Sequence, residues 1–111
     1  MEPEEISLVP PPEIARNAAK GLRLRREFGR GGTAIGVARA EELAARRALQ
    51  PSTIRRMVSY FARHEVDKRA RNFGNEKNPS AGYVAWLLWG GDEGRAWALD
   101  LKQRIGNAPD I

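Results

Sequence analysis

Apolar residues recur along most of the chain at the three- and four-residue spacing of amphipathic helices, and no segment shows the alternation typical of a strand. The clearest case is Ile54, Met57, Val58 and Phe61, which share one helical face at positions i, i+3, i+4 and i+7. The pattern predicts an all-α fold, a compact bundle of four or five short helices.

Capping and helix-breaking residues predict where these helices begin and end. The expected helices cover residues 13–28, 34–48, 53–63, 81–89 and 93–105. The expected N-caps are Thr33, Ser52, Ser80 and Asp92. The first helix should bury a stripe of Ile14, Ala18, Leu22 and Arg25. The expected core is Phe28, Ile54, Met57, Phe61, Val84, Leu87, Leu88, Trp97 and Leu101.

The chain of 111 residues has the length of one domain. We expect an acidic, Pro-rich arm without regular structure at residues 1–12, one helical domain at residues 13–106 and a short tail at residues 107–111. Residues 64–79 are expected to form a charged loop. The glycine-rich residues 29–33 are expected to be a connector, because they lack the preceding strand and the Gly-Lys-Ser/Thr of a phosphate-binding loop.

The residue types needed for catalysis are sparse. There is no cysteine, and the single histidine, His64, cannot form a zinc site alone. No serine lies in the strand-to-helix turn of a nucleophile elbow, and the same histidine would have to serve each of them. We therefore expect no enzyme, no catalytic residue, no metal and no cofactor.

The four letters Gly90-Gly91-Asp92-Glu93 match the start of the diguanylate cyclase signature. A cyclase domain needs a mixed sheet and a longer chain. In this sequence the four residues lie between two segments with helical spacing, so we expect a corner between two helices. The glycines would end one helix and Asp92 would cap the next.

Basic charge is concentrated in the middle of the chain. The net charge is +5, and residues 13–74 hold 15 of the 19 Lys and Arg residues against 6 acids. Such a segment is typical of proteins that bind nucleic acid, because Lys and Arg replace counterions on phosphates. The candidate contacts are Arg23, Arg26, Arg46, Ser52, Thr53, Arg55 and Arg56.

Residues 42–57, ELAARRALQPSTIRRM, resemble a helix-turn-helix. Ala44, Leu49, Ile54 and Met57 match its small and apolar positions, whereas Ala48 replaces the usual turn glycine and Arg47 an apolar residue. The resemblance implies that the second helix enters a DNA major groove. Ser52 and Thr53 would then lie near phosphates, and Arg55 and Arg56 near bases or phosphates.

Three longer blocks are LRREFGRGGTAIGVARAEEL, PSTIRRMVSYFARHEVDK and PSAGYVAWLLWGGDEGRAWA, and together they cover residues 22–98. They are similar to a helical module of bacteriophage and prophage proteins, some of them encoded near head-assembly or prohead-protease genes. The resemblance implies a phage origin and assigns no activity. Because the acidic start lacks the basic and apolar regions of a signal peptide, we expect a cytoplasmic protein, in a host cytoplasm or a virion if it is phage-encoded.

Two functions remain open at this stage. The first is non-catalytic binding of nucleic acid through the Arg-rich surface. The second is a protein-interaction or assembly module without a nucleic-acid role, in which an exposed Trp86 or Trp89 would anchor a protein partner or a second copy. No apolar run is long enough to cross a membrane, so no membrane partner is expected, and no small-molecule substrate is indicated.

Overall fold

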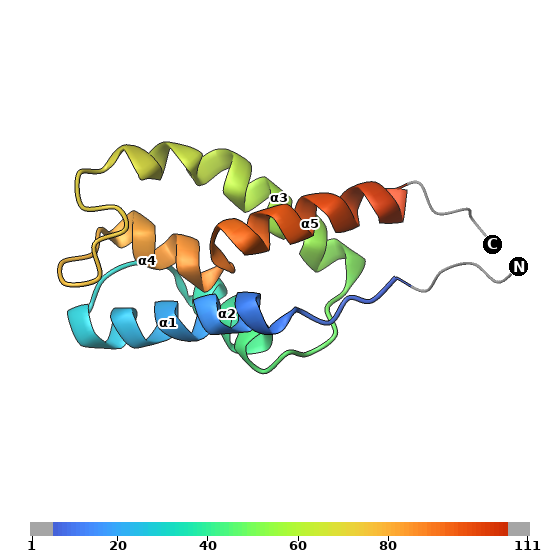
Figure 1. The fold of residues 1–111 in the computed structure, drawn as a ribbon, viewed down its shortest axis with the longest axis horizontal. Coiled ribbons are helices and arrows are strands. Elements are labelled where there is room, and N and C mark those ends of the chain that lie inside the picture. Colours follow the sequence, from blue (N-terminus) through green and yellow to red (C-terminus); the bar gives the residue numbers. More distant parts are fainter. Residues whose placement is uncertain (1–5, 107–111) are drawn as a thin grey trace, which may run out of the picture.

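The computed structural model describes residues 6–106, and this stretch contains helices and irregular segments but no strand. Its helices are α1 (Pro12–Phe28), α2 (Ala34–Ala44), α3 (Pro51–His64), the short 3-10 helix η1 (Glu65–Arg69), α4 (Ala81–Leu88) and α5 (Gly91–Gly106). Figure 1 shows how they follow one another along the chain. The predicted all-α bundle is confirmed.

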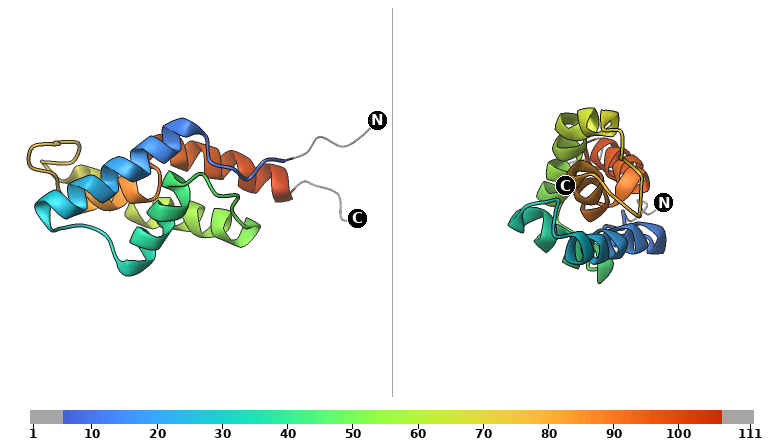
Figure 2. Two further views of the ribbon diagram at one scale, coloured as in Figure 1. Left: turned by 90° about the horizontal axis from the view of Figure 1, so that it is seen from below. Right: turned by 90° about the vertical axis from the view of Figure 1, so that its left-hand side faces the viewer.

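Helix α4 lies at the centre of the bundle and packs against every other helix. In the end-on view of Figure 2, α1, α3 and α5 are arranged around it. The central position follows from its sequence, AGYVAWLL, which carries no charged residue and whose large side chains Val84, Trp86, Leu87 and Leu88 are buried. The outer helices pack in pairs, α1 against α2 and α3 against α5.

The core agrees with the sequence prediction at most positions. The predicted residues that are buried are Ile54, Met57, Phe61, Val84, Leu87, Leu88 and Leu101. Phe28 and Trp97 are only half-buried and pack against the edge of the core. Phe28 lies in the last turn of α1 and Trp97 in the middle of α5, and each side chain remains partly exposed to solvent.

Two of the expected N-caps are confirmed. The Thr33 hydroxyl accepts a hydrogen bond from the Gly36 N–H at 3.2 Å, and the Ser80 hydroxyl accepts one from the Tyr83 N–H at 3.0 Å. The prediction for Ser52 was wrong, because α3 begins two residues earlier than expected, at Pro51, and Ser52 lies inside its first turn. Proline suits the first helical position, where its missing N–H has no intrahelical partner to lose.

Helix α2 is shorter than predicted and ends at Ala44, not at residue 48. Arg46 has φ of 54°, a left-handed conformation that interrupts the helix. Two contacts with the N-terminal segment hold the chain there. The Leu49 N–H donates to the Leu8 carbonyl at 2.9 Å, and Arg46 Nε donates to the Pro10 carbonyl at 2.8 Å.

The described part of the N-terminal arm, residues 6–11, has no helix or strand, but it is not free of the domain. Ile6 and Leu8 pack against the core, and Pro10 is buried. The predictions for residues 1–5 and 107–111 lie outside the described residues. The predicted loop at residues 64–79 is helical at its start, because η1 continues the path of α3 for a further turn.

The buried stripe of α1 is rotated from the predicted one. It consists of Ile14, Ala15, Ala18, Gly21 and Leu24, whereas Leu22 and Arg25 are half-buried. Gly21 explains the rotation, because it allows the backbones of α1 and α4 to approach closely. A Cβ on Gly21 would lie 2.8 Å from the Leu88 backbone nitrogen.

We predict that Gly21→Ala lowers the free energy of unfolding by about 1–3 kcal/mol, the usual cost of overpacking a core. Alanine otherwise favours a helix by about 1 kcal/mol over glycine. Gly106→Ala is the matched control, since a Cβ there has open space around it. Urea denaturation of both variants measures the difference, and equal stability would contradict the close approach of α1 and α4.

Candidate functional site

The segment Gly90-Gly91 forms the predicted corner between α4 and α5. Gly90 has φ of 114° and Gly91 φ of 70°, both in the region that favours glycine. The Gly90 N–H donates to the Leu87 carbonyl, and the Gly90 carbonyl accepts the first hydrogen bond of α5, from the Gly94 N–H at 3.0 Å. The chain therefore leaves one helix and enters the next within two residues.

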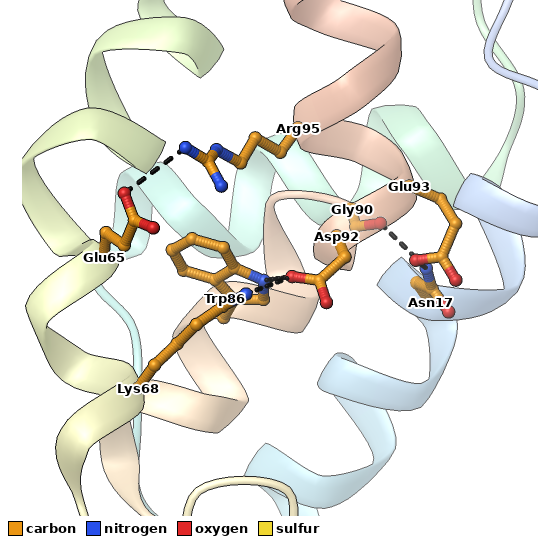
Figure 3. A network of polar contacts seen from close by, with 8 residues as sticks. All are labelled: Asn17, Glu65, Lys68, Trp86, Gly90, Asp92, Glu93 and Arg95. Atoms are coloured by element: carbon orange, nitrogen blue, oxygen red, sulfur yellow. Dashed lines mark hydrogen bonds and ion pairs between the residues drawn. The ribbon is translucent and has the colours of Figure 1, made fainter.

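Asp92 does not cap α5 as predicted. Its carboxylate oxygen Oδ1 accepts hydrogen bonds from the Trp86 indole nitrogen at 2.9 Å and from Lys68 Nζ at 2.7 Å (Figure 3). The Trp86 side chain is only 2% exposed, so its N–H needs a partner inside the protein. Asp92 in the first turn of α5 supplies that partner, and the hydrogen bond from Lys68 lowers the pKa of the Asp92 carboxyl.

The other charged groups at the corner also have protein partners. Asn17 Nδ2 donates to the Gly90 carbonyl at 2.8 Å and to the Glu93 carboxylate at 3.2 Å. Arg95 pairs with Glu65 at 3.3 Å (Figure 3). Within residues 6–106 no cluster of His, Asp and Glu could hold a metal ion. Gly90, Gly91, Asp92 and Glu93 therefore form a packed junction between α1, η1, α4 and α5, with both carboxylates bonded within the protein.

We predict that Asp92→Ala lowers the free energy of unfolding by about 1–3 kcal/mol, because the buried Trp86 N–H loses its acceptor. The control is Lys68→Ala, which removes the other donor to Asp92 and should cost at most about 1 kcal/mol as a partly exposed ion pair. Thermal or urea denaturation compares the two. If both variants lose the same stability, the indole hydrogen bond is not the important contact.

A groove of about 1100 Å³ opens on a different side of the bundle, along α3. The α3 side of the groove carries Ser52, Arg55, Arg56, Ser59, Arg63 and His64. Their spacing of three and four residues places them on one helical face, next to the face that packs on the core. The opposite wall is formed by Gly32, Thr33 and Ile35 at the start of α2. Residues of α4 and the neighbouring Trp89 form the floor.

The groove is strongly basic. Arg55, Arg56 and Arg63 line it, and the only acid among its lining residues is Asp67, which pairs with His64 Nδ1 at 3.1 Å. Within residues 6–106 none of the three arginines has an ion pair or a side-chain hydrogen bond. Arg16, Arg23, Arg26 and Arg47 are exposed and also have no ion pair among the described residues, but they do not line the groove. The groove therefore offers three guanidinium groups to an external anion.

A continuous stack of planar groups supports the groove from below. Trp89 lies between Arg39, whose guanidinium carbon is 5.5 Å from the ring centre, and Tyr60, whose ring is 4.6 Å away and almost parallel. The other face of Tyr60 stacks on His64 at 4.5 Å. Stacked rings contribute about 0.5–1.5 kcal/mol for each pair beyond their buried area. The stack connects Arg39 of α2, Tyr60 and His64 of α3, and Trp89 at the end of α4.

Two polar atoms of this stack, Arg39 Nε and the Tyr60 hydroxyl, are buried and have no hydrogen-bond partner among the described residues. Burial raises the pKa of the Tyr60 hydroxyl, and the nearby Asp67 carboxylate acts in the same direction. The hydroxyl is therefore neutral and keeps its proton.

The structure brings together only part of the predicted nucleic-acid site. Ser52, Arg55 and Arg56 line the groove, whereas Thr53 is buried in the core and cannot contact a ligand. The remaining three lie away from the groove: Arg23 and Arg26 are exposed on α1, and Arg46 contacts the N-terminal segment. The prediction for Thr53 was wrong because Thr53 lies on the face of α3 that packs on the core, with Ile54 and Met57.

Sequence reasoning missed Arg63, Tyr60, Ile35 and Trp89 as groove residues. A signal for Arg63 was present, because it continues the spacing of Ser52, Arg56 and Ser59 along α3. No local signal marks Ile35 and Trp89, since they join the groove only through the packing of α2 and α4. The prediction that Trp86 or Trp89 is an exposed anchor was wrong, because they are 2% and 8% exposed.

The helix-turn-helix resemblance does not extend to the geometry. Six residues separate α2 from α3, whereas the motif has a turn of three or four. The two helices are described in full, and no Cα atom of one lies within 8 Å of a Cα atom of the other. They are held apart by the floor of the groove and do not form the packed pair that presents a recognition helix.

Comparison with protein-family models, with curated proteins and with solved structures found no match. The resemblance to a phage module therefore stays a prediction. No helix in residues 6–106 has the length and apolar composition needed to cross a membrane.

Proposed function

We propose that the protein binds nucleic acid, without catalysis, through the groove along α3. The observation that carries the proposal is that Arg55, Arg56 and Arg63 line one groove and have no acidic partner in the described chain. Unpaired guanidinium groups at this spacing suit a polyanion whose phosphates repeat regularly. The phage origin suggested by the sequence, in a host cytoplasm or a virion, belongs to the same proposal.

The polar groups in the groove favour binding over chemistry. His64 is engaged on both sides, since its ring stacks on Tyr60 and its Nδ1 pairs with Asp67. Neither Ser52 nor Ser59 has a hydrogen bond to a general base among the described residues. A hydroxyl without such a base is a weak nucleophile, whereas it can donate a hydrogen bond to a phosphate oxygen.

A protein partner is the competing proposal, and one observation favours it. Ile35 is 63% exposed and lies on the wall of the groove. An exposed apolar side chain in a groove can anchor a peptide. Trp86 and Trp89 no longer serve as anchors in this proposal, because both are buried. The three unpaired arginines would then require the peptide to be acidic.

We predict that the double variant Arg55→Gln/Arg56→Gln weakens binding to a labelled oligonucleotide. It should also reduce the slope of log K against log salt by about 1.4 for a single strand or about 1.8 for a duplex, because two phosphate contacts are lost. Fluorescence anisotropy at several salt concentrations measures both quantities.

The charge-matched control is Arg16→Gln/Arg47→Gln. Both of these arginines are exposed and lie outside the groove. A general charge effect would weaken binding equally in the two double variants and would contradict the proposal. Binding with no salt dependence in the unmodified protein would contradict it as well.

A further inference from the structure

We infer that the ligand of the groove is single-stranded nucleic acid and not a duplex, with phosphates on the α3 arginines and bases against the opposite wall and the floor. The inference rests on the proposed function and adds the class of ligand. It depends on the shape of the groove and on how charged and apolar residues are distributed over its sides.

The shape of the groove argues against a duplex. A helix that reads the major groove must protrude, because an α-helix with its side chains, about 10–12 Å wide, fills a groove of about 12 Å. The arginine face of α3 instead lines one side of a concave groove, and the rest of its lining includes Thr33 and Ile35 at the start of α2. A duplex that followed α3 would collide with this wall.

The dimensions of the groove suit a short single strand. Residues 52–63 of α3 advance by about 16 Å, at 1.5 Å for each residue. A stacked strand rises by about 3.4 Å for each nucleotide, so the arginine side spans about five nucleotides. The volume of about 1100 Å³ is large enough to hold several bases beside the backbone.

One side of the groove is charged and the other is apolar, which matches the two edges of a nucleic-acid single strand. The α3 side has guanidinium and hydroxyl groups for phosphates. The other side and the floor are mainly apolar, with Ile35, Ala81, Ala85 and an edge of Trp89. A single strand has the same division, with a charged backbone along one edge and flat apolar bases along the other. In a duplex the bases face inward and could not cover Ile35.

The direct test compares two labelled DNA probes by fluorescence anisotropy, a thymidine single strand of about 12 nucleotides and a blunt duplex of the same length. We expect the single strand to bind at least about tenfold more tightly, with a salt slope near −2 for three phosphate contacts. Equal or tighter binding of the duplex, lost in Arg55→Gln/Arg56→Gln, would overturn the inference and leave the proposed function standing. Binding of neither probe would overturn both.

A competitor separates nucleic acid from an acidic polypeptide. Polyglutamate, added at the same concentration of negative charge, should displace the single strand poorly, since it has no bases for the apolar wall. Displacement as efficient as that by unlabelled single strand would overturn the inference.

A pair of matched variants tests the apolar wall. Ile35→Ser should weaken binding of the single strand about three- to tenfold and leave the salt slope unchanged, because no charge is lost. Val66→Ser is the control, since Val66 is also exposed and does not line the groove. If Ile35→Ser binds as tightly as Val66→Ser, bases do not enter the groove and the inference is wrong.

Discussion

The burial of α4 is the constraint on which the rest of the structure depends. This short helix carries no charged residue, and its large side chains Val84, Trp86, Leu87 and Leu88 are buried, so the fold must cover most of its surface. Each of the other helices contributes part of that cover. Two features follow from the burial of α4. Gly21 lets α1 pack closely against α4, because a Cβ there would clash with it, and Gly90-Gly91 allow the sharp corner that brings α5 back against α4.

Two buried tryptophans, Trp86 in α4 and Trp89 at its end, connect α4 to residues nearer the surface. Trp86 is buried with a polar N–H, which requires Asp92 and, through it, places Lys68 of η1 against the corner. Trp89 is buried between Arg39 and Tyr60, which connects α2 to α3. The groove is the space that remains between these two helices above the stack. Its position is therefore set by core packing, although its arginines are exposed.

The sequence predicted those features that depend on local spacing. The all-α fold, the core face of α3, the caps at Thr33 and Ser80 and the corner at Gly90-Gly91 all follow from residues close together in the chain. The errors arose where a distant contact decided the outcome. The Leu8 carbonyl accepts a hydrogen bond from the Leu49 N–H just after the early end of α2. The Asp92 carboxylate accepts a hydrogen bond from the Trp86 indole and does not cap α5.

In the candidate site, too, local spacing predicted some residues, whereas contacts between distant parts of the chain determined the others. Arg55 and Arg56 could be chosen from the charge pattern of α3, and their neighbour Arg63 from the same spacing. Ile35 and Trp89 could not, because they reach the groove from other helices. The predicted contacts on α1 do not line it either. The predicted site was a broad basic surface with α3 as a recognition helix. The candidate site in the structure is one groove, and α3 forms one of its sides.

The most direct measurement of the central claim, that the groove along α3 binds nucleic acid, is an NMR titration of the ¹⁵N-labelled protein with a thymidine oligonucleotide. The account predicts shifts at residues 52–64, at residues 32–35 and at the indole N–H of Trp89. The indole N–H of Trp86, bonded to Asp92, should not shift. Shifts that cluster instead on α1 around Arg23 and Arg26, with residues 52–64 unchanged, would contradict it.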